Sequence, residues 1–409
     1  MTRHGLLSPR PLDALRQLMI SRGAPAADDE ALLRAARDPR HKLAVTLLSG
    51  WQASGRLLTD EQRAELAEHR HRIGRYLEVW PVIAAAAPDA YLVKGSAIAA
   101  HYPAGLLRAA GDLDVVCPAA QLWPAARRLI EAGWEFGAFT IVPGRTSPPA
   151  VSRTRRGGTG DAAGWHILVE LSQPSDTSID EPYVIELRTA DVATSIARPA
   201  WRLPAGASFP VAANILALAA ERWERPFRSR DIYDLAVLSD RLDAAEAASL
   251  RDGLTATGLW PELRELAGLL RRSGLRPAPS LPDDRAAVRR ARAARALRSA
   301  VRWSHPVRAL GYLSLATVDR DRGARADRLA WLVGERIGTR RLLRLGLPLF
   351  AVPLPAGPAP AGSPRAAPDE LSLVQRGGHL VAVTPVGRFL MVAGACQEQW
   401  LAQACDGGL

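Results

Sequence analysis

Two aspartates stand two positions apart in the segment GDLDVVC, whose composition is that of a short β-strand. Side chains alternate between the faces of a strand, so Asp112 and Asp114 share one face while Leu113 and Val115 point into the core. Two such carboxylates can share a hard cation such as Mg²⁺, which keeps waters and accepts substrate phosphates as further ligands. The spacing indicates a metal and nucleotide site; its alternative is a strand end with two solvated acids.

A glycine and a serine precede this pair, where the β-prone run YLVKG changes to the helix-prone run SAIAAHY. Backbone N–H groups at the start of a helix attract phosphate, and glycine lets a ligand come close to the main chain. Gly95 and Ser96 are therefore predicted to hold triphosphate oxygens, which a metal on Asp112 and Asp114 would bridge.

The chain carries 53 Lys and Arg residues against 42 Asp and Glu residues, and this net charge of +11 favours a polyanionic partner such as a nucleotide or RNA. Only Lys42 and Lys94 are lysines. Where so arginine-rich a chain keeps a lysine, a compact ammonium rather than a planar guanidinium is indicated. Lys94 is thus a candidate for phosphate binding or for a structural anchor; the alternative is a strand-end lysine that reaches solvent.

The elements that must position these residues follow from the periodicity of the apolar positions. Residues 11 to about 88 have helical spacing, with Thr59 at one helix start, and residues 91–136 alternate as strand, helix, strand, helix with the two strands side by side. FGAFTIVP, WHILVELSQ and YVIELRT are predicted strands, a long Gly- and Ser-rich loop covers about 144–164, and helices follow to 345. We expect an N-terminal helical region (1–88), an α/β core (89–205), a helical domain (206–350), a Pro/Ala/Gly-rich linker (351–369) and a small β-rich C-terminal appendage (370–409).

The overall composition is 48% hydrophobic and 23% charged over 409 residues, which is the balance of a globular protein rather than a disordered one. No apolar run reaches the roughly 18 residues of a membrane span, and the N-terminus lacks the apolar segment of a signal peptide. We therefore expect a soluble, cytoplasmic protein without a membrane partner. Cys117, Cys396 and Cys405 have no pairing pattern, so neither a disulfide nor a zinc site is expected.

Residues 91–136 resemble the polymerase-β-like nucleotidyltransferase superfamily, in which a Gly-Ser pair at a helix start precedes hydrophobic-Asp-hydrophobic-Asp. The segment is most similar to the branch called uncharacterised nucleotidyltransferases, in which Lys-Gly opens the motif, Tyr-Pro follows, and an arginine precedes Gly-Asp-x-Asp. The resemblance implies a small mixed sheet with helices, flanked by N-terminal and C-terminal helical regions. It also implies that Arg108 joins Lys94, Gly95 and Ser96 as a nucleotide-binding residue. The matching positions are Lys94, Gly95, Tyr102, Pro103, Arg108, Gly111, Asp112 and Asp114.

The later segment AANILALAAERWERPFRSRDIYDLAVLSD is similar to the helical region of abortive-infection-type nucleotidyltransferase toxins, which have an Arg-Asp-x-x-Asp-Leu helix after the catalytic sheet. The lysine that these toxins carry at the start of this region is absent, and Asn214 stands nearby. Asp231 and Asp234 are expected either to bind substrate or to have a structural role, capping the helix or pairing with Arg230. The resemblance covers about residues 90–240.

The superfamily has a third carboxylate on a later strand, and two glutamates have a suitable setting here. Glu170 in HILVEL and Glu186 in YVIELR each lie in an alternating strand pattern. Glu170 is preferred because the branch usually places its acid on the strand after the long hairpin loop. Side-chain parity is expected to let only one of the two face Asp112 and Asp114.

The resemblance implies a nucleotidyltransferase whose catalytic residues and metal ligands, Asp112, Asp114 and Glu170, hold Mg²⁺, or Mn²⁺ in its place. The implied reaction moves a nucleoside monophosphate from an NTP to a hydroxyl of a small molecule, a peptide or protein, or a tRNA, and releases pyrophosphate. Two alternatives stay open. One is a nucleotidyltransferase toxin of a toxin–antitoxin pair, and the other is a non-catalytic nucleotide- or peptide-binding scaffold in a biosynthetic assembly.

Overall fold

The computed structural model describes most of the chain. The described residues are 11–25, 28–143, 165–178, 181–189, 191–192, 201–202, 210–223, 225–275, 278–303, 338–339, 349–354, 371–376, 378–392 and 396–406. The long loop expected at 144–164 and the expected linker from residue 355 onward lie outside them.

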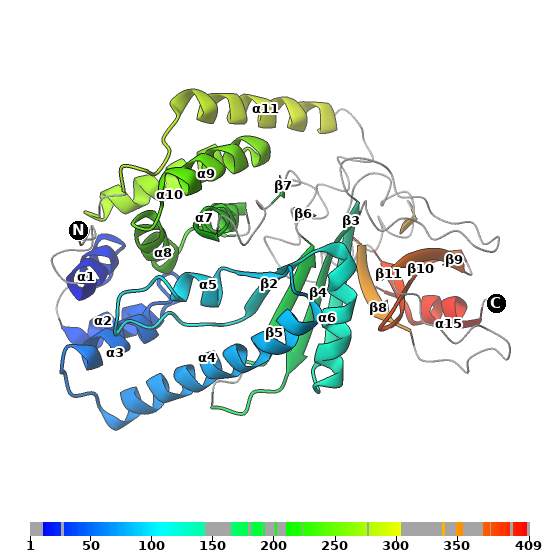
Figure 1. The fold of residues 1–409 in the computed structure, drawn as a ribbon, viewed down its shortest axis with the longest axis horizontal. Coiled ribbons are helices and arrows are strands. Elements are labelled where there is room, and N and C mark those ends of the chain that lie inside the picture. The colour runs from blue at the N-terminus through cyan, green and yellow to red at the C-terminus, as the bar shows by residue number, and fades with distance from the viewer. Residues whose placement is uncertain are drawn as a thin grey trace.

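A nine-stranded mixed sheet runs through the described part of the chain (Figure 1). Its strands are β1 (Tyr91–Val93), β2 (Leu113–Cys117), β3 (Glu135–Pro143), β4 (Trp165–Gln173), β5 (Tyr183–Thr189), β8 (Leu349–Pro353), β9 (Ser372–Arg376), β10 (His379–Thr384) and β11 (Gly387–Val392). Their order in the sheet is β1-β2-β5-β4-β3-β8-β11-β10-β9, and only the β2–β5 pair is parallel among the described pairs. Two short strands, β6 (Asp191–Val192) and β7 (Trp201–Arg202), pair separately. The α/β expectation is confirmed, and the sheet is larger than expected.

Helices cover the sheet on both faces. They are α1 (Pro11–Ser21), α2 (Asp29–Arg37), α3 (Ala44–Ala53), α4 (Asp60–Ala86), α5 (Gly95–Ala99), α6 (Ala119–Glu131), α7 (Pro210–Ala220), α8 (Ser229–Ser239), α9 (Ala244–Thr257), α10 (Trp260–Arg272), α11 (Arg285–Trp303) and α15 (Glu398–Asp406), with a 3₁₀ turn η3 (Glu221–Trp223). The predicted helix start at Thr59 is confirmed, because Thr59 and Gln62 form a reciprocal capping box. The strand, helix, strand, helix order of residues 91–136 is confirmed as well, and β1 and β2 are neighbours.

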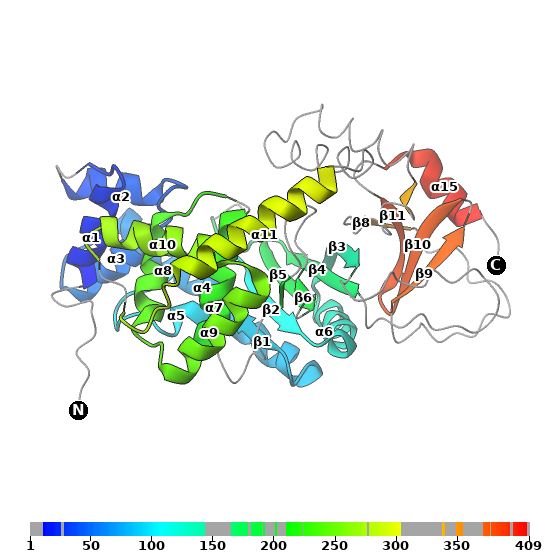
Figure 2. The same ribbon diagram turned by 90° about the horizontal axis from the view of Figure 1, so that it is seen from above.

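The two faces of the sheet bury different helices, which determines what the aspartates face. Leu113, Val115 and Cys117 pack in a core with α4 and α6, whereas Val116 packs in a core with α1–α3 and α7–α11. Because side chains alternate along β2, Asp114 lies on the face of Val116. Helices α1–α3 therefore share a core with the later helices rather than forming a separate N-terminal unit (Figure 2).

The C-terminal strands continue the same sheet instead of forming an independent appendage. β8 pairs with β3 through Thr140 with Phe350 and Ile141 with Leu349, and β11, β10 and β9 follow in order. Figure 1 shows these strands and α15 at the end of the molecule opposite α1 and α2. The β-rich character expected for residues 370–409 is confirmed by β9, β10 and β11.

Within the described residues, no helix combines the length and the apolar character that crossing a bilayer requires. Cys117, Cys396 and Cys405 are free thiols, of which Cys117 is buried.

Candidate functional site

Strand register places three acidic residues in one row across the sheet. Asp114 on β2 is opposite Glu186 on β5, and Glu186 is opposite Glu170 on β4. Residues opposite each other on neighbouring strands project from the same face. The expectation that only one glutamate has the right parity is therefore wrong: both share the face of Asp114, and Glu186 is the nearer. We call Asp112, Asp114 and Glu186 the carboxylate cluster.

The two aspartates of the cluster differ in their neighbours. Asp114 is 3% exposed and pairs with two cations, whereas the half-buried Asp112 forms no ion pair with any described residue. The negative charge of Asp114, followed by burial, raises the pKa of Asp112. A carboxylate pair that repels itself in this way is stabilised by a shared cation.

Glu186 is the carboxylate of the cluster whose pKa is raised toward neutral pH. Burial, followed by repulsion from Asp114, outweighs the attraction of Arg188 and raises the pKa of Glu186 to about 7. Arg188 lies two residues along β5 on the same face and donates to both Asp114 and Glu186. Sequence reasoning missed Arg188, although the same period of two that relates Asp112 to Asp114 also relates Glu186 to Arg188.

Lys94 is held as an anchor of the cluster. Its Nζ lies 2.5 Å from Oε1 of Glu221 and 3.9 Å from Oδ1 of Asp114. Burial alone would raise the pKa of Glu221, but Lys94 and then Arg225 outweigh it and lower the pKa to about 2. Of the two roles expected for Lys94, phosphate binding or structural anchor, its contacts match the anchor. No sequence signal pointed to Glu221.

The backbone at Lys94 is strained, with φ +57° and ψ −137°. A residue other than glycine in this region costs about 1–3 kcal/mol and persists where its surroundings impose it. Here Oδ1 of Asn214 on α7 accepts the Lys94 N–H at 2.6 Å, while the Asn214 amide donates to the Pro210 carbonyl at 2.8 Å. Asn214, the position near which the toxins carry lysine, thus fixes the turn between β1 and α5.

The predicted phosphate cradle lies against the Asp pair. A Cβ on Gly95 would stand 3.3 Å from the carbonyl oxygen of Asp112, so a side chain there would push the Asp112 loop. Oγ of Ser96 is buried and has no hydrogen-bond partner among the described residues. Gly95 therefore lies against the Asp112 backbone, and the adjacent Ser96 has a buried hydroxyl with no partner among the described residues.

Tyr76 on α4 links the two strands that carry the cluster. Its hydroxyl donates to the Gly111 carbonyl at 2.8 Å and accepts the Val184 N–H at 3.1 Å. Arg72, one turn earlier and 2% exposed, also donates to the Gly111 carbonyl, at 3.3 Å. Both residues fix the backbone directly before Asp112, and sequence reasoning missed them because the contacts are to main-chain atoms far along the chain.

We expect Tyr76→Phe to lower the free energy of unfolding by about 1–3 kcal/mol, because the Val184 N–H loses this acceptor and the Gly111 carbonyl keeps only the longer bond from Arg72. Urea unfolding followed by tryptophan fluorescence measures this. Tyr233→Phe is the matched control: the Tyr233 hydroxyl is buried without a partner in the described part of the chain, so its removal should be neutral or stabilising. Equal losses in both variants would contradict the bridging role of Tyr76.

Arg108 forms a buried ion pair with Asp234. It is 5% exposed, and its Nε and Nη2 both bond the carboxylate of Asp234 on α8, with Nη2 to Oδ2 at 2.8 Å. Tyr102 donates to the same carboxylate at 2.6 Å. The nucleotide-binding role that the resemblance implied for Arg108 does not match this geometry, because its guanidinium is committed to a buried ion pair.

Arg108→Met should cost about 3–5 kcal/mol of unfolding free energy, since it leaves the Asp234 carboxylate buried without its counter-charge. Chemical denaturation checks this. The double variant Arg108→Met/Asp234→Leu should recover most of the loss, and Arg128→Met, which breaks an exposed pair with Glu131, should cost less than about 1 kcal/mol. A loss below about 1 kcal/mol in Arg108→Met would show that the buried ion pair with Asp234 does not stabilise the packing of α8.

The donor types of the cluster fit Mg²⁺, but the chain alone does not complete a metal centre. Among the residues that the structure describes, no three His, Cys, Asp or Glu side chains converge as a metal-binding group. Arg188 lies between Asp114 and Glu186. Asp112 and Asp114 can offer carboxylate oxygens, with water and phosphate as the remaining ligands, which is how Mg²⁺ is usually bound at nucleotide sites.

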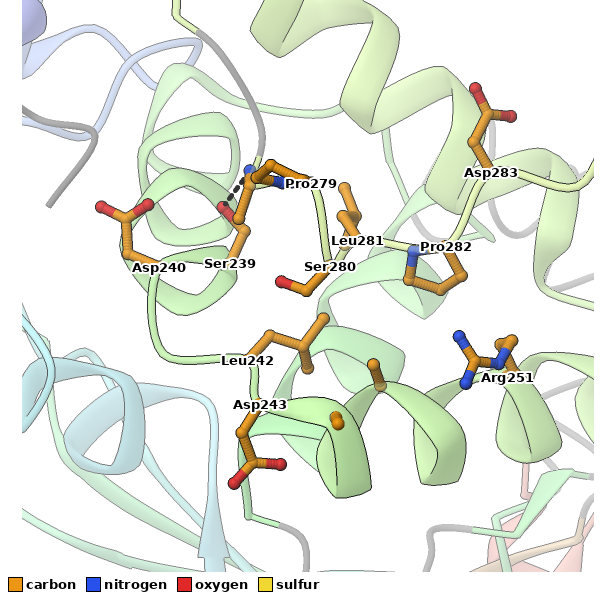
Figure 3. A pocket seen from close by; sticks show the side chains of 13 residues that line it. Ser239, Asp240, Leu242, Asp243, Arg251, Pro279, Ser280, Leu281, Pro282 and Asp283 are labelled. Carbon is orange, nitrogen blue, oxygen red and sulfur yellow. Dashed lines mark hydrogen bonds between the residues drawn. The ribbon is translucent and has the colours of Figure 1, made fainter. Parts of the chain in front are cut away.

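A separate pocket of about 870 Å³ lies between the end of α8, α9 and residues 278–283 (Figure 3). Ser239, Asp243 and Arg251 are among its lining residues, together with small apolar side chains. None of its lining residues belongs to the carboxylate cluster or to the predicted cradle. The candidate functional site is therefore the cluster and not this pocket.

Comparison of the chain with protein-family models, with curated proteins and with solved structures found no match. The chemistry of the cluster must therefore be argued from its own residues.

Proposed function

We propose that this protein is a metal-dependent nucleotidyltransferase that moves a nucleoside monophosphate from an NTP to an acceptor hydroxyl and releases pyrophosphate. The observation that supports this most is the buried carboxylate row, with the Asp pair beside a glutamate of pKa about 7 and directly against Gly95 and Ser96. The proposed setting is the cytoplasm, where NTPs and Mg²⁺ are abundant.

Asp112 and Asp114 would hold Mg²⁺ or Mn²⁺. When bound, such an ion neutralises charge on the triphosphate and orients the α-phosphate for in-line attack. Lys94 helps to fix Asp114 in place through the contacts described above. The Ser96 hydroxyl and the Gly95 backbone would contact phosphate oxygens, which the unpartnered Oγ of Ser96 supports.

Glu186 would accept the proton of the acceptor hydroxyl. The acceptor oxygen then bonds the α-phosphorus, the bond from that phosphorus to the oxygen bridging the β-phosphate breaks, and pyrophosphate leaves. A base with a pKa about 7 combines a useful unprotonated fraction with sufficient basicity at neutral pH. We assign this role to Glu186 in place of Glu170 because Glu186 is adjacent to Asp114, whereas Glu170 is one strand farther.

The acceptor is a small molecule, a peptide or protein side chain, or a tRNA, and a toxin that modifies such a target uses the same chemistry. A non-catalytic nucleotide-binding scaffold is the second candidate function. One observation favours it: Arg188 and Lys94 already neutralise Asp114, so the cluster is balanced without a metal.

Transfer of label separates these functions. The purified chain is incubated with each α-³²P-labelled NTP, Mg²⁺ or Mn²⁺, and tRNA, peptides or the protein itself as acceptor. We expect labelled acceptor and released pyrophosphate with α-label and no labelled acceptor with γ-label. Acceptor labelled from γ-labelled NTP would indicate a kinase, and NTP binding without any transfer would support the scaffold.

A further inference from the structure

Several cations around the carboxylate cluster are paired with carboxylates of the chain, but Arg230 is not. Arg230, at the start of α8, forms no ion pair and no side-chain hydrogen bond with any described residue, and its Nε is buried without a partner. Neither Asp231 nor Asp234 forms an ion pair with Arg230, but the alternative expectation of a cap is confirmed for Asp231, which accepts the Arg228 N–H at 2.7 Å at the start of α8. The committed pairs are Lys94 with Glu221, Arg188 with Asp114 and Glu186, Arg108 with Asp234, and Arg225 with Glu221 and Asp231.

The backbone around Arg230 is fixed. The Arg230 N–H donates to the His41 carbonyl at 3.1 Å, and the Ser229 N–H donates to the Arg40 carbonyl at 2.9 Å. The Ser229 hydroxyl and Nδ1 of His41 are 2.8 Å apart. The loop between α2 and α3 therefore holds the start of α8 in place, so Arg230 is presented from a rigid element.

The guanidinium of Arg230 acts electrostatically on the cluster without touching it. Asp114 and burial raise the pKa of Asp112, while Lys94 and then Arg230 oppose that rise. Arg230 also adds to the effect of Lys94 and Arg225 on Glu221. Arg230 is thus close enough to act on both carboxylates, and it remains outside ion-pair distance of each.

The Arg230 guanidinium has a buried Nε and no ion pair with a described residue. Burial and then Arg108 lower the pKa of Arg230, whereas Asp234 and Asp231 raise it without forming an ion pair with it. Burial also lowers the pKa of Lys42, followed by repulsion from Arg228 and Arg230. Arginine does not give up its proton at neutral pH, and a buried charge without a partner is unfavourable. An anionic ligand would remove this cost.

We propose that Arg230 is the phosphate-binding cation of this site and holds the triphosphate of the NTP, while Lys94 and Arg108 serve as structural ion pairs. The guanidinium matches phosphate through parallel N–H donors, which an ammonium cannot reproduce. This inference rests on the proposed nucleotidyl transfer only for the identity of the nucleotide. Binding of a bare phosphate chain tests it independently.

The test uses the full chain and measures binding of inorganic tripolyphosphate and of Mg²⁺–ATP by calorimetry. Arg230→Gln should weaken both by about 10- to 100-fold, the loss typical of one charge-assisted contact, and Arg230→Lys should fall between. Arg222→Gln, which breaks an exposed pair with Glu265, should bind as the parent chain does. Without ligand, Arg230→Gln should melt at the same or a higher temperature, because no described residue loses an ion pair.

The assignment would be overturned if Arg230→Gln bound tripolyphosphate as tightly as the parent chain, or if the parent chain itself did not bind it measurably. A lower melting temperature of ligand-free Arg230→Gln would also overturn it, because that result would indicate a structural role. The outcome for the proposed function is separate. If Arg230→Gln loses tripolyphosphate binding but the parent chain transfers no label, the anion site stands and nucleotidyl transfer does not. If Arg230→Gln transfers label with an unchanged KM for NTP, nucleotidyl transfer stands and the assignment of Arg230 as the phosphate-binding cation does not.

Discussion

Asp112→Asn should abolish metal-dependent transfer, by at least about 10³-fold, and leave the fold intact. Losing a metal ligand removes several kcal/mol of transition-state stabilisation, and each 1.36 kcal/mol is a factor of ten in rate. Since the Asp112 carboxylate has no ion pair among the described residues and is destabilised by Asp114, the neutral variant should melt at an equal or higher temperature. Label transfer in saturating Mg²⁺ and thermal unfolding measure the two effects.

Asp114→Asn, two residues farther along the chain and on β2, is the matched comparison. It should be equally inactive but less stable, because Lys94 and Arg188 both lose a carboxylate that is 3% exposed. The two variants are therefore expected to be equally inactive but to differ in thermal stability. Near-parental turnover in either variant would place the reaction elsewhere, and a large stability loss in Asp112→Asn would mean that Asp112 has a structural partner.

Glu186→Gln should lower kcat by about 10²- to 10⁴-fold, the usual contribution of a general base, with a much smaller change in KM for NTP. Glu170→Gln is the control, since Glu170 projects from the same face one strand farther from Asp114. Glu170→Gln should leave both kcat and KM nearly unchanged. If Glu170→Gln were inactive and Glu186→Gln active, the general base would be Glu170, the residue preferred from the sequence.

The same substitution should change the pH dependence of stability. The folded pKa of Glu186, about 7, lies above its ordinary value of 4.5, so the native state holds a proton that the unfolded state releases. Stability is then highest below pH 4.5 and falls as the pH rises to about 7. Glu186→Gln keeps the neutral form, so it should gain on the order of 2–3 kcal/mol over the parent at pH 8 and little at pH 4.5. Denaturant unfolding at the two pH values measures this, and an equal difference at both would show an unperturbed carboxyl.

Local pattern was sufficient to predict the strand that carries Asp114, because alternation over five residues fixes which side chains share a face. The prediction that Asp112 lies on the same strand was wrong, because β2 begins at Leu113 and Asp112 is in the loop before it. Local pattern could not decide between Glu170 and Glu186. Both lie on well-predicted strands, but the order β2-β5-β4, which makes Glu186 the neighbour of Asp114, is a property of long-range pairing.

Contacts between distant segments account for the rest of what the sequence missed. Arg108 reads as a motif arginine, and only the packing of α8 against the Arg108 loop reveals Asp234 as its partner. The apolar faces of α1–α3 were visible as helical periodicity, but an apolar face does not identify the surface that covers it. Asn214 and Tyr76 act on main-chain atoms, whose partners no side-chain pattern encodes.

The pairing of β8 with β3 has a consequence for how the protein is made. Thr140 and Phe350 are opposite each other although more than two hundred residues separate them in the chain. During synthesis, the carboxylate cluster and the helices that cover it can form before β8 leaves the ribosome. Until β8 has been synthesised, the edge of β3 that pairs with it stays unpaired. Closing so long a loop is slow, and an unpaired edge strand readily accepts a strand from another molecule. The nascent chain is therefore most exposed to aggregation and to dependence on chaperones in this interval, when its chemistry is already assembled.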